Sequence, residues 1–234
     1  MSGGSESTQF LISGGYTDQD GIAVGSNFKR FTARINVDTK VTKWLQIGAQ
    51  SSLARTKRNN TIDDNNVIQT ALRQLPEVPA RNPDGSWGYQ EDNQLGIYYT
   101  NPLADALTRE NMNKGLQAII NAYANITILP GLTARIEYGG TFDRGNWYYF
   151  QPEMKLGEMK QTSQSNRQSS SSRYTNFKQY LTYMKDFGKH SLNIMAGHES
   201  QQSEWENLSA GRTGYLFNNC LLYTSPSPRD RSLS

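Results

Sequence analysis

Strict alternation of apolar and polar residues over long stretches is the feature that most limits what this chain can fold into. Residues 30–38 show it most clearly, because Phe31, Ala33, Ile35 and Val37 alternate with polar residues that include two arginines. Successive side chains of a β-strand point to opposite faces, so a period of two predicts a strand with one apolar and one polar face. The chain is therefore expected to be all-β.

The same period recurs along most of the chain. Further strands are expected at residues 9–17, 44–53, 117–128, 133–142, 176–186 and 191–201, which makes about seven strands. Several reach about ten residues, longer than the ~5–6 of globular sheets and close to the ~9–11 that a tilted strand needs to cross a bilayer. Strand length therefore favours a transmembrane β-barrel.

The connections between these expected strands alternate in length. Medium or long connections lie at residues 18–27, 57–115 and 144–175, and short ones lie at 39–43, 130–131 and 187–190. Outer-membrane barrels combine short periplasmic turns with long extracellular loops. The chain is therefore expected to form part of a transmembrane antiparallel β-barrel with its short turns in the periplasm. A soluble β-sandwich explains the residue alternation equally well, but not the alternation of loop lengths.

Composition and motifs argue against several other classes. The mean hydropathy is -0.71, and no stretch approaches the ~18 uncharged apolar residues of a spanning helix. The formal net charge is +3 without a run of Lys or Arg, so no nucleic-acid partner is expected. The two histidines lack metal-ligand spacing, and GxSxG, Walker and dinucleotide motifs are missing. We therefore expect no enzyme activity, cofactor or metal site.

Two features are expected in the longer connections. Asp63 and Asp64 can cap a helix that carries apolar side chains from Val67 to Leu75 and ends at Pro76. Residues 162–172 are rich in Ser, Gln and Asn, and we expect a mobile, low-complexity loop there.

Aromatic residues gather in the expected extracellular loops. They are Trp87, Tyr89, Tyr98, Tyr99, Trp147, Tyr148 and Tyr149. Aromatic faces stack on sugar rings and peptide side chains, so these residues could contact a substrate. Packing between loops, or an aromatic girdle at the outer membrane interface, explains them too, and both interpretations stay open.

The polar strand faces and the short turns supply the other candidate residues. We expect the following polar side chains to face a barrel lumen: Arg34, Asn36, Gln46, Gln50, Asn121, Arg135 and Glu137. Trp44, Tyr183 and Phe187 lie beside short turns, where a periplasmic aromatic girdle is expected.

The last residues differ in character from the rest of the chain. Back-translation of residues 220–230 resembles a transposon-end adaptor of sequencing libraries, and this segment includes the only cysteine, Cys220. We therefore expect residues 1–219 to be the barrel segment and residues 220–234 to be a non-native tail. A native Pro/Ser linker is the alternative.

Over residues 2–219 the sequence resembles the SusC/RagA family of TonB-linked outer-membrane proteins. The likeness rests on STQFLISGGYTDQDGI, VTKWLQIGAQSSLARTKRNN, NNVIQTALRQLPEVPARNPDGSW, LPGLTARIEYGGTFDR and FGKHSLNIMAGHESQQSEWE. The resemblance implies an outer-membrane importer of glycans or peptides with a large barrel of about 22 strands. It also implies outer-membrane lipid around the barrel, a SusD-like surface lipoprotein as partner, and a TonB complex that acts through an N-terminal part outside this chain.

Two other functions remain open at this point. A siderophore-type receptor or a passive porin would show the same strand pattern without the SusC likeness. A soluble β-sandwich binding module is the third possibility.

Overall fold

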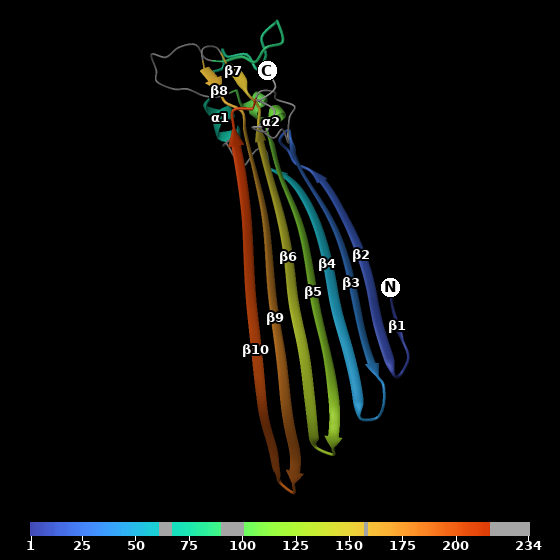
Figure 1. The fold of residues 1–234 in the computed structure, drawn as a ribbon. Helices are drawn as coiled ribbons and strands as arrows, with labels where there is room; N and C mark the ends of the chain where they lie inside the picture. Colours follow the sequence, from blue (N-terminus) through green and yellow to red (C-terminus); the bar gives the residue numbers. More distant parts are fainter. Residues whose placement is uncertain (61–66, 90–100, 157–158, 216–234) are drawn as a thin grey trace, which may run out of the picture.

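The computed structural model describes residues 1–60, 67–89, 101–156 and 159–215. Eight strands form one sheet in the order β1-β2-β3-β4-β5-β6-β9-β10, and each strand is antiparallel to its neighbours. Their bounds are β1 Ser2–Gly4, β2 Thr8–Asp20, β3 Ser26–Lys40, β4 Leu45–Asn60, β5 Glu110–Leu129, β6 Leu132–Gln151, β9 Gln164–Phe187 and β10 His190–Thr213. The sheet is an open, curved wall with β1 and β10 at its edges (Figure 1).

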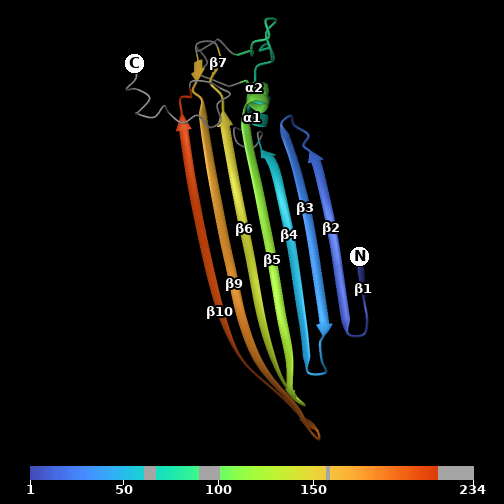
Figure 2. The same cartoon turned by 45° about the vertical axis from the view of Figure 1, so that its right-hand side comes forward.

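The two ends of this wall differ. At the turn end, the strands are joined by residues 5–7, 41–44, 130–131 and 188–189. Gly131 and Gly188 adopt φ angles of 86° and 63°, a left-handed conformation that glycine accepts without steric cost. At the opposite loop end, the connections are residues 21–25, 61–109 and 152–163. Figures 1 and 2 both place the helices and the small ribbon at the loop end.

The described residues of the loop end form four small elements. Helix α1 spans Val67–Arg73 and α2 spans Pro102–Thr108, while β7 (Met154–Leu156) and β8 (Met159–Gln161) form a separate two-stranded ribbon. The expected helix in the long connection is thus confirmed, although its expected caps, Asp63 and Asp64, lie outside the described residues. The sequence analysis did not predict α2, although Asn101 followed by Pro102 is a typical start of a helix.

The all-β prediction is confirmed, but three expectations about the loops were wrong. The expected loop 144–175 is mostly strand, because β6 continues to Gln151 and β9 begins at Gln164. The expected mobile segment 162–172 is almost entirely part of β9, paired with β6 on one side and β10 on the other. The first expected connection shrinks to residues 21–25, about as short as the turns at the opposite end.

The sheet has one apolar face along its turn-end half. The aligned side chains of this apolar band include Ile35, Ile47, Leu53, Ile120, Ile136, Phe177 and Leu181. All seven are among the exposed large hydrophobic residues. Within the described residues no second sheet covers this face, which argues against a β-sandwich, whose stability requires two packed sheets.

The strands are longer than the apolar band. On β5, the band runs from residue 118 to residue 128, whereas the whole strand has 20 residues. At about 3.3 Å per residue, the strand is about 66 Å long, against about 30 Å for a hydrocarbon core. The loop-end half of the sheet therefore extends well beyond any membrane that the band could span. Among the described residues, no helix has the length and apolar character of a membrane-spanning helix.

Candidate functional site

The polar face of the sheet brings together the side chains expected to line a lumen. The register aligns Asn36, Gln50 and Asn121 in one row across β3, β4 and β5. The adjacent row toward the turn end contains Glu137, and the row beyond it contains Gln46 and Arg135. Arg34 lies one row from Asn36 in the other direction. All seven predicted residues thus share one face, opposite the apolar band.

A hydrogen-bonded network crosses the middle of this face. The Tyr123 hydroxyl on β5 donates to the Asp38 carboxylate on β3, so the side chain reaches across β4. The Gln46 amide donates to the same hydroxyl at 3.5 Å. Arg135 stacks over the Tyr123 ring, with its guanidinium carbon 4.2 Å from the ring centroid. The network therefore ties β3, β4, β5 and β6 together through side chains as well as through the backbone.

Gly48 makes this reach possible. It lies in the same cross-strand row, between Asp38 and Tyr123. A Cβ atom at Gly48 would approach the Tyr123 ring carbon Cζ and the Asp38 Oδ1 to 2.5 Å each, far closer than ordinary contact. The missing side chain therefore forms the gap through which the tyrosine bonds to β3.

Charged pairs extend the network across the remaining strands. Arg135 forms an ion pair with Glu137 and donates to the Asn125 side-chain oxygen at 3.0 Å. Lys178 on β9 pairs with Glu199 on β10 at 3.4 Å. A hollow of about 220 Å³ lies among these groups, lined by Gln50, Asn121, Tyr123, Arg135, Glu137 and Lys178. The arrangement offers donors and acceptors to a polar ligand or a packed polar domain.

Sequence reasoning missed the centre of this network. Tyr123 interrupts the polar side of the alternation on β5, and that irregularity is the only local signal of its role. Asp38 and Lys178 look like ordinary solvated charges in the sequence. Their partners lie on other strands, so only the register brings them together.

The predicted loop aromatics separate into different environments. Trp87 and Tyr89 pack against a small core of Ala104 and Met154 at the loop end, and Arg81 lies 3.8 Å over the Trp87 ring. These contacts favour the loop-packing interpretation for both residues. Tyr98 and Tyr99 lie outside the described residues.

Trp147, Tyr148 and Tyr149 belong to β6, which corrects their expected position in a loop. Trp147 and Tyr149 share the polar face, where their rings stack with centroids 6.0 Å apart. The Trp147 indole donates to the Asn111 side-chain oxygen at 2.7 Å. Tyr148 lies on the opposite face, because neighbouring residues of a strand alternate. The three aromatics therefore cannot line one substrate surface.

The residues expected at a periplasmic girdle lie at the turn end. Tyr183 and Phe187 share the face of the apolar band on β9, while Trp44 directly precedes β4 and is exposed. Their role at a membrane interface stays a prediction.

The loop-end elements are held by buried polar contacts. Asn101 caps α2 by accepting hydrogen bonds from the backbone N–H groups of Leu103 and Ala104, both at 3.0 Å. Its amide also donates to the carbonyls of Ala80 and Gly88, at 3.0 and 2.8 Å. One buried side chain thus joins the helix to the segment that carries Trp87.

A turn completes this segment. Asn82 and Gly85 close it with a backbone hydrogen bond of 2.9 Å, as the Asn-Pro-Asp-Gly sequence favours. The hydroxyl and the backbone N–H of Ser86 donate to Asp84 and hold the pKa of that carboxyl below its usual value. Among the described residues, no group of three or more His, Cys, Asp or Glu side chains could hold a metal ion.

Curated proteins that resemble this chain are TonB-dependent receptors. The chain is similar to the TonB-dependent receptor P3 of Formosa agariphila, at 28% identity over 93% of this chain and 22% of that receptor. It is also similar to the TonB-dependent receptor SusC of Bacteroides thetaiotaomicron, at 24% identity over 91% of this chain and 23% of SusC. The chain spans about a fifth of the length of these relatives. No protein-family model matches the chain.

Solved structures share the fold. The RagAB peptide importer in its open-open state aligns with a TM-score of 0.77 at 22% identity, over 97% of this chain and 26% of the importer chain. A second RagAB peptide transporter structure aligns with a TM-score of 0.74 at 23% identity, over 94% of this chain and 26% of that one.

The sheet, its two contrasting faces and the similarity to these relatives support the assignment of the chain to a TonB-dependent receptor. Within that class, the similarity to SusC and to the RagAB structures supports the SusC/RagA type.

Proposed function

We propose that this chain forms part of the barrel wall of an outer-membrane importer that takes up glycans or peptides together with a SusD-like lipoprotein. The observation that carries the proposal is the division of one sheet into an apolar face and a hydrogen-bonded polar face. A wall between lipid and an aqueous lumen requires that division, because its strand side chains alternate between the two environments. The similarity to SusC and to the RagAB structures supports the same function.

This function assigns an orientation to the sheet. The turn end faces the periplasm, with Trp44, Tyr183 and Phe187 as its aromatic girdle, and the loop end faces the cell exterior. The polar network around Tyr123 then faces the lumen. Transport through such a lumen needs no covalent chemistry, so the chain is not an enzyme. Energy would come from a TonB complex that acts on another part of the receptor.

The substrate-contacting residues follow from the same orientation. Trp147 and Tyr149 lie on the lumen face at the loop end, where an incoming substrate would first meet the wall. Trp147 is half-buried, so part of its ring can stack on a sugar ring or a peptide side chain, and the buried Tyr149 supports it from behind. Trp87 and Tyr89 would act indirectly, by holding the loop-end elements in place.

Purification of the intact receptor from outer membranes tests the proposal. We expect a SusD-like lipoprotein to co-purify, and mass spectrometry of the complex to detect bound oligosaccharide or peptide. Deletion of the gene should abolish growth on that compound as sole carbon or nitrogen source. Recovery of the receptor without a lipoprotein, with an iron chelate bound, would favour a siderophore receptor instead. Energy-independent passage of small solutes would favour a porin.

A further inference from the structure

The face of the sheet that carries the apolar band becomes basic next to the band, on its loop-end side. Four exposed basic residues meet there on three neighbouring strands, namely Arg55, Lys57, Lys114 and Arg144. We call these four residues the basic cluster. Each lies on the same face as the apolar band, because each is an even number of residues from a member of the band on its own strand.

The register brings these charges close together. Lys57 is directly opposite Lys114 in the pairing of β4 with β5. In the adjacent row, Leu116 lies between Arg55 and Arg144. Strands are about 4.8 Å apart and alternate residues on one face about 6.6 Å apart. The basic cluster therefore occupies a patch of about 10 Å by 7 Å, with the apolar Leu116 inside it.

Nothing in the described part of the chain neutralises this cluster. Neighbouring basic residues on the same face are paired, since Lys29 contacts Asp18 at 2.8 Å and Arg173 contacts Glu204 at 2.6 Å. No described carboxylate lies within ion-pair distance of the four residues of the basic cluster. The other carboxylates on this part of the face are Asp20, Glu110 and Glu206, on the rim or the edge strand. Like charges directly opposite in a sheet are destabilising, so an anion beside the pair Lys57–Lys114 would stabilise this part of the sheet.

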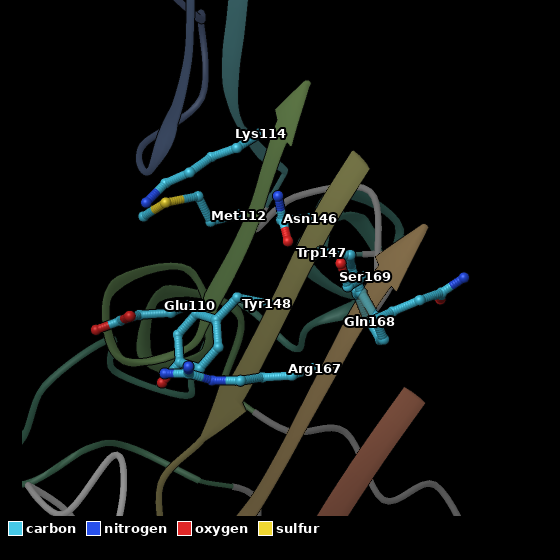
Figure 3. Close-up of a pocket in the computed structure, with 9 residues that line it drawn as sticks. All are labelled: Glu110, Met112, Lys114, Asn146, Trp147, Tyr148, Arg167, Gln168 and Ser169. Carbon is cyan, nitrogen blue, oxygen red and sulfur yellow. The ribbon is translucent and has the colours of Figure 1, made fainter. Parts of the chain in front are cut away.

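A hollow of about 490 Å³ borders the cluster on its loop-end side (Figure 3). Its lining includes Lys114, Asn146, Met112, Tyr148, Arg167 and Ser169, and also the carboxylate residue Glu110. The Arg167 guanidinium lies 5.1 Å from the Tyr148 ring centroid. The basic side chains of Lys114 and Arg167 outnumber the single carboxylate of Glu110 in this lining. With its amide and hydroxyl groups and the Tyr148 ring, the cavity suits a sugar that carries a phosphate.

On the turn-end side of the basic cluster, the same face is apolar and can contact acyl chains. Leu53, Ala118 and Phe142 form the next row and begin the apolar band. One ligand that contacts both regions needs anionic groups on a polar head and hydrocarbon chains beneath them. We propose that the basic cluster binds the phosphorylated headgroup of a glycolipid of the outer membrane leaflet, whose acyl chains lie along the band. The proposal rests on the outer-membrane location proposed above.

Lipid binding by the intact receptor tests the proposal. The probe is purified lipid A, with its dephosphorylated form as a second probe, and bound lipid is counted by native mass spectrometry. The test variant is Lys57→Gln/Lys114→Gln. The matched control is Lys43→Gln/Lys189→Gln, which removes two exposed lysines at the turn end. Neither variant alters a buried residue, and co-purification of the lipoprotein partner reports separately on the proposed function.

We expect the test variant to bind lipid A at least about tenfold more weakly than the wild type, because it removes two of the four positive charges that attract the anionic headgroup. The control should stay within about twofold of the wild type, since its lysines lie at the other end of the sheet. Dephosphorylated lipid A should bind the wild type as weakly as lipid A binds the test variant. Equal binding of the two lipids, or an unchanged test variant, would overturn the proposal. Displacement of lipid A by millimolar inorganic phosphate would also overturn it in favour of a soluble anion.

Discussion

At the scale of single residues, small and polar side chains decide how the strands are tied together. Gly48 leaves the gap through which Tyr123 reaches Asp38, and Asn101 joins α2 to the segment around Trp87. Neither role depends on apolar burial. Both depend on which atoms the fold brings opposite one another.

Gly48→Ala should lower the stability of the folded receptor by about 1–3 kcal/mol, because the added Cβ forces Tyr123 away from Asp38. Gly14→Ala is the matched control, since a Cβ at Gly14 meets nothing closer than the Thr32 carbonyl oxygen at 3.9 Å. Urea unfolding of the receptor in lipid vesicles measures both. Equal losses in the two variants would contradict the proposed role of Gly48.

Asn101→Ala should loosen the loop end, because it removes the cap of α2 and leaves two carbonyls without their donor. The cap is worth about 1 kcal/mol and each orphaned buried group about 1–3 kcal/mol. Asn101→Asp keeps an acceptor for the cap but loses the donors to Ala80 and Gly88. Hydrogen exchange should therefore rise in residues 80–89 in both variants, and in α2 only in the alanine variant. Unchanged exchange in residues 80–89 would disprove the link.

At the scale of elements, backbone pairing extends strands into sequence that has no apolar pattern. The Ser-rich beginning of β9 pairs on both sides, with Ser170 opposite Gly145 on β6 and Asn207 on β10. This part of the sheet lies beyond the apolar band, so neither face has to be apolar. Hydrophobic periodicity cannot detect such a strand, and composition suggested a loop.

Ser170→Pro distinguishes strand from loop. Proline lacks an N–H and is poorly accommodated in a central strand, so we expect a loss of about 2 kcal/mol or more. Ser170→Thr should cost almost nothing, because threonine favours strands. Limited proteolysis and urea unfolding of the intact receptor report the difference. Tolerance of the proline would show that residues 162–172 behave as the expected loop.

At the scale of the whole molecule, the sheet is incomplete as a barrel. Within the described residues, no further strand pairs with the outer edges of β1 and β10, and the apolar band is exposed. Open edges and uncovered apolar faces promote association between chains.

We therefore expect residues 1–215, expressed alone, to aggregate in water and to stay dispersed only in detergent. Analytical ultracentrifugation with and without detergent measures this. A soluble monomer with a cooperative thermal unfolding transition would contradict the assignment of the sheet as a barrel wall.

The sequence by itself determined the class of fold, the two contrasting faces, and the strands that cross the apolar band. Alternation sufficed there, because a strand between an apolar and a polar environment must repeat every two residues. Only the tertiary structure decided where the strands end, that Tyr148 faces away from Trp147 and Tyr149, and that Lys57 lies opposite Lys114. The register pairs residues that are far apart in the chain. It does so through backbone hydrogen bonds, which nearly every residue type can form, so the local sequence does not reveal the partners.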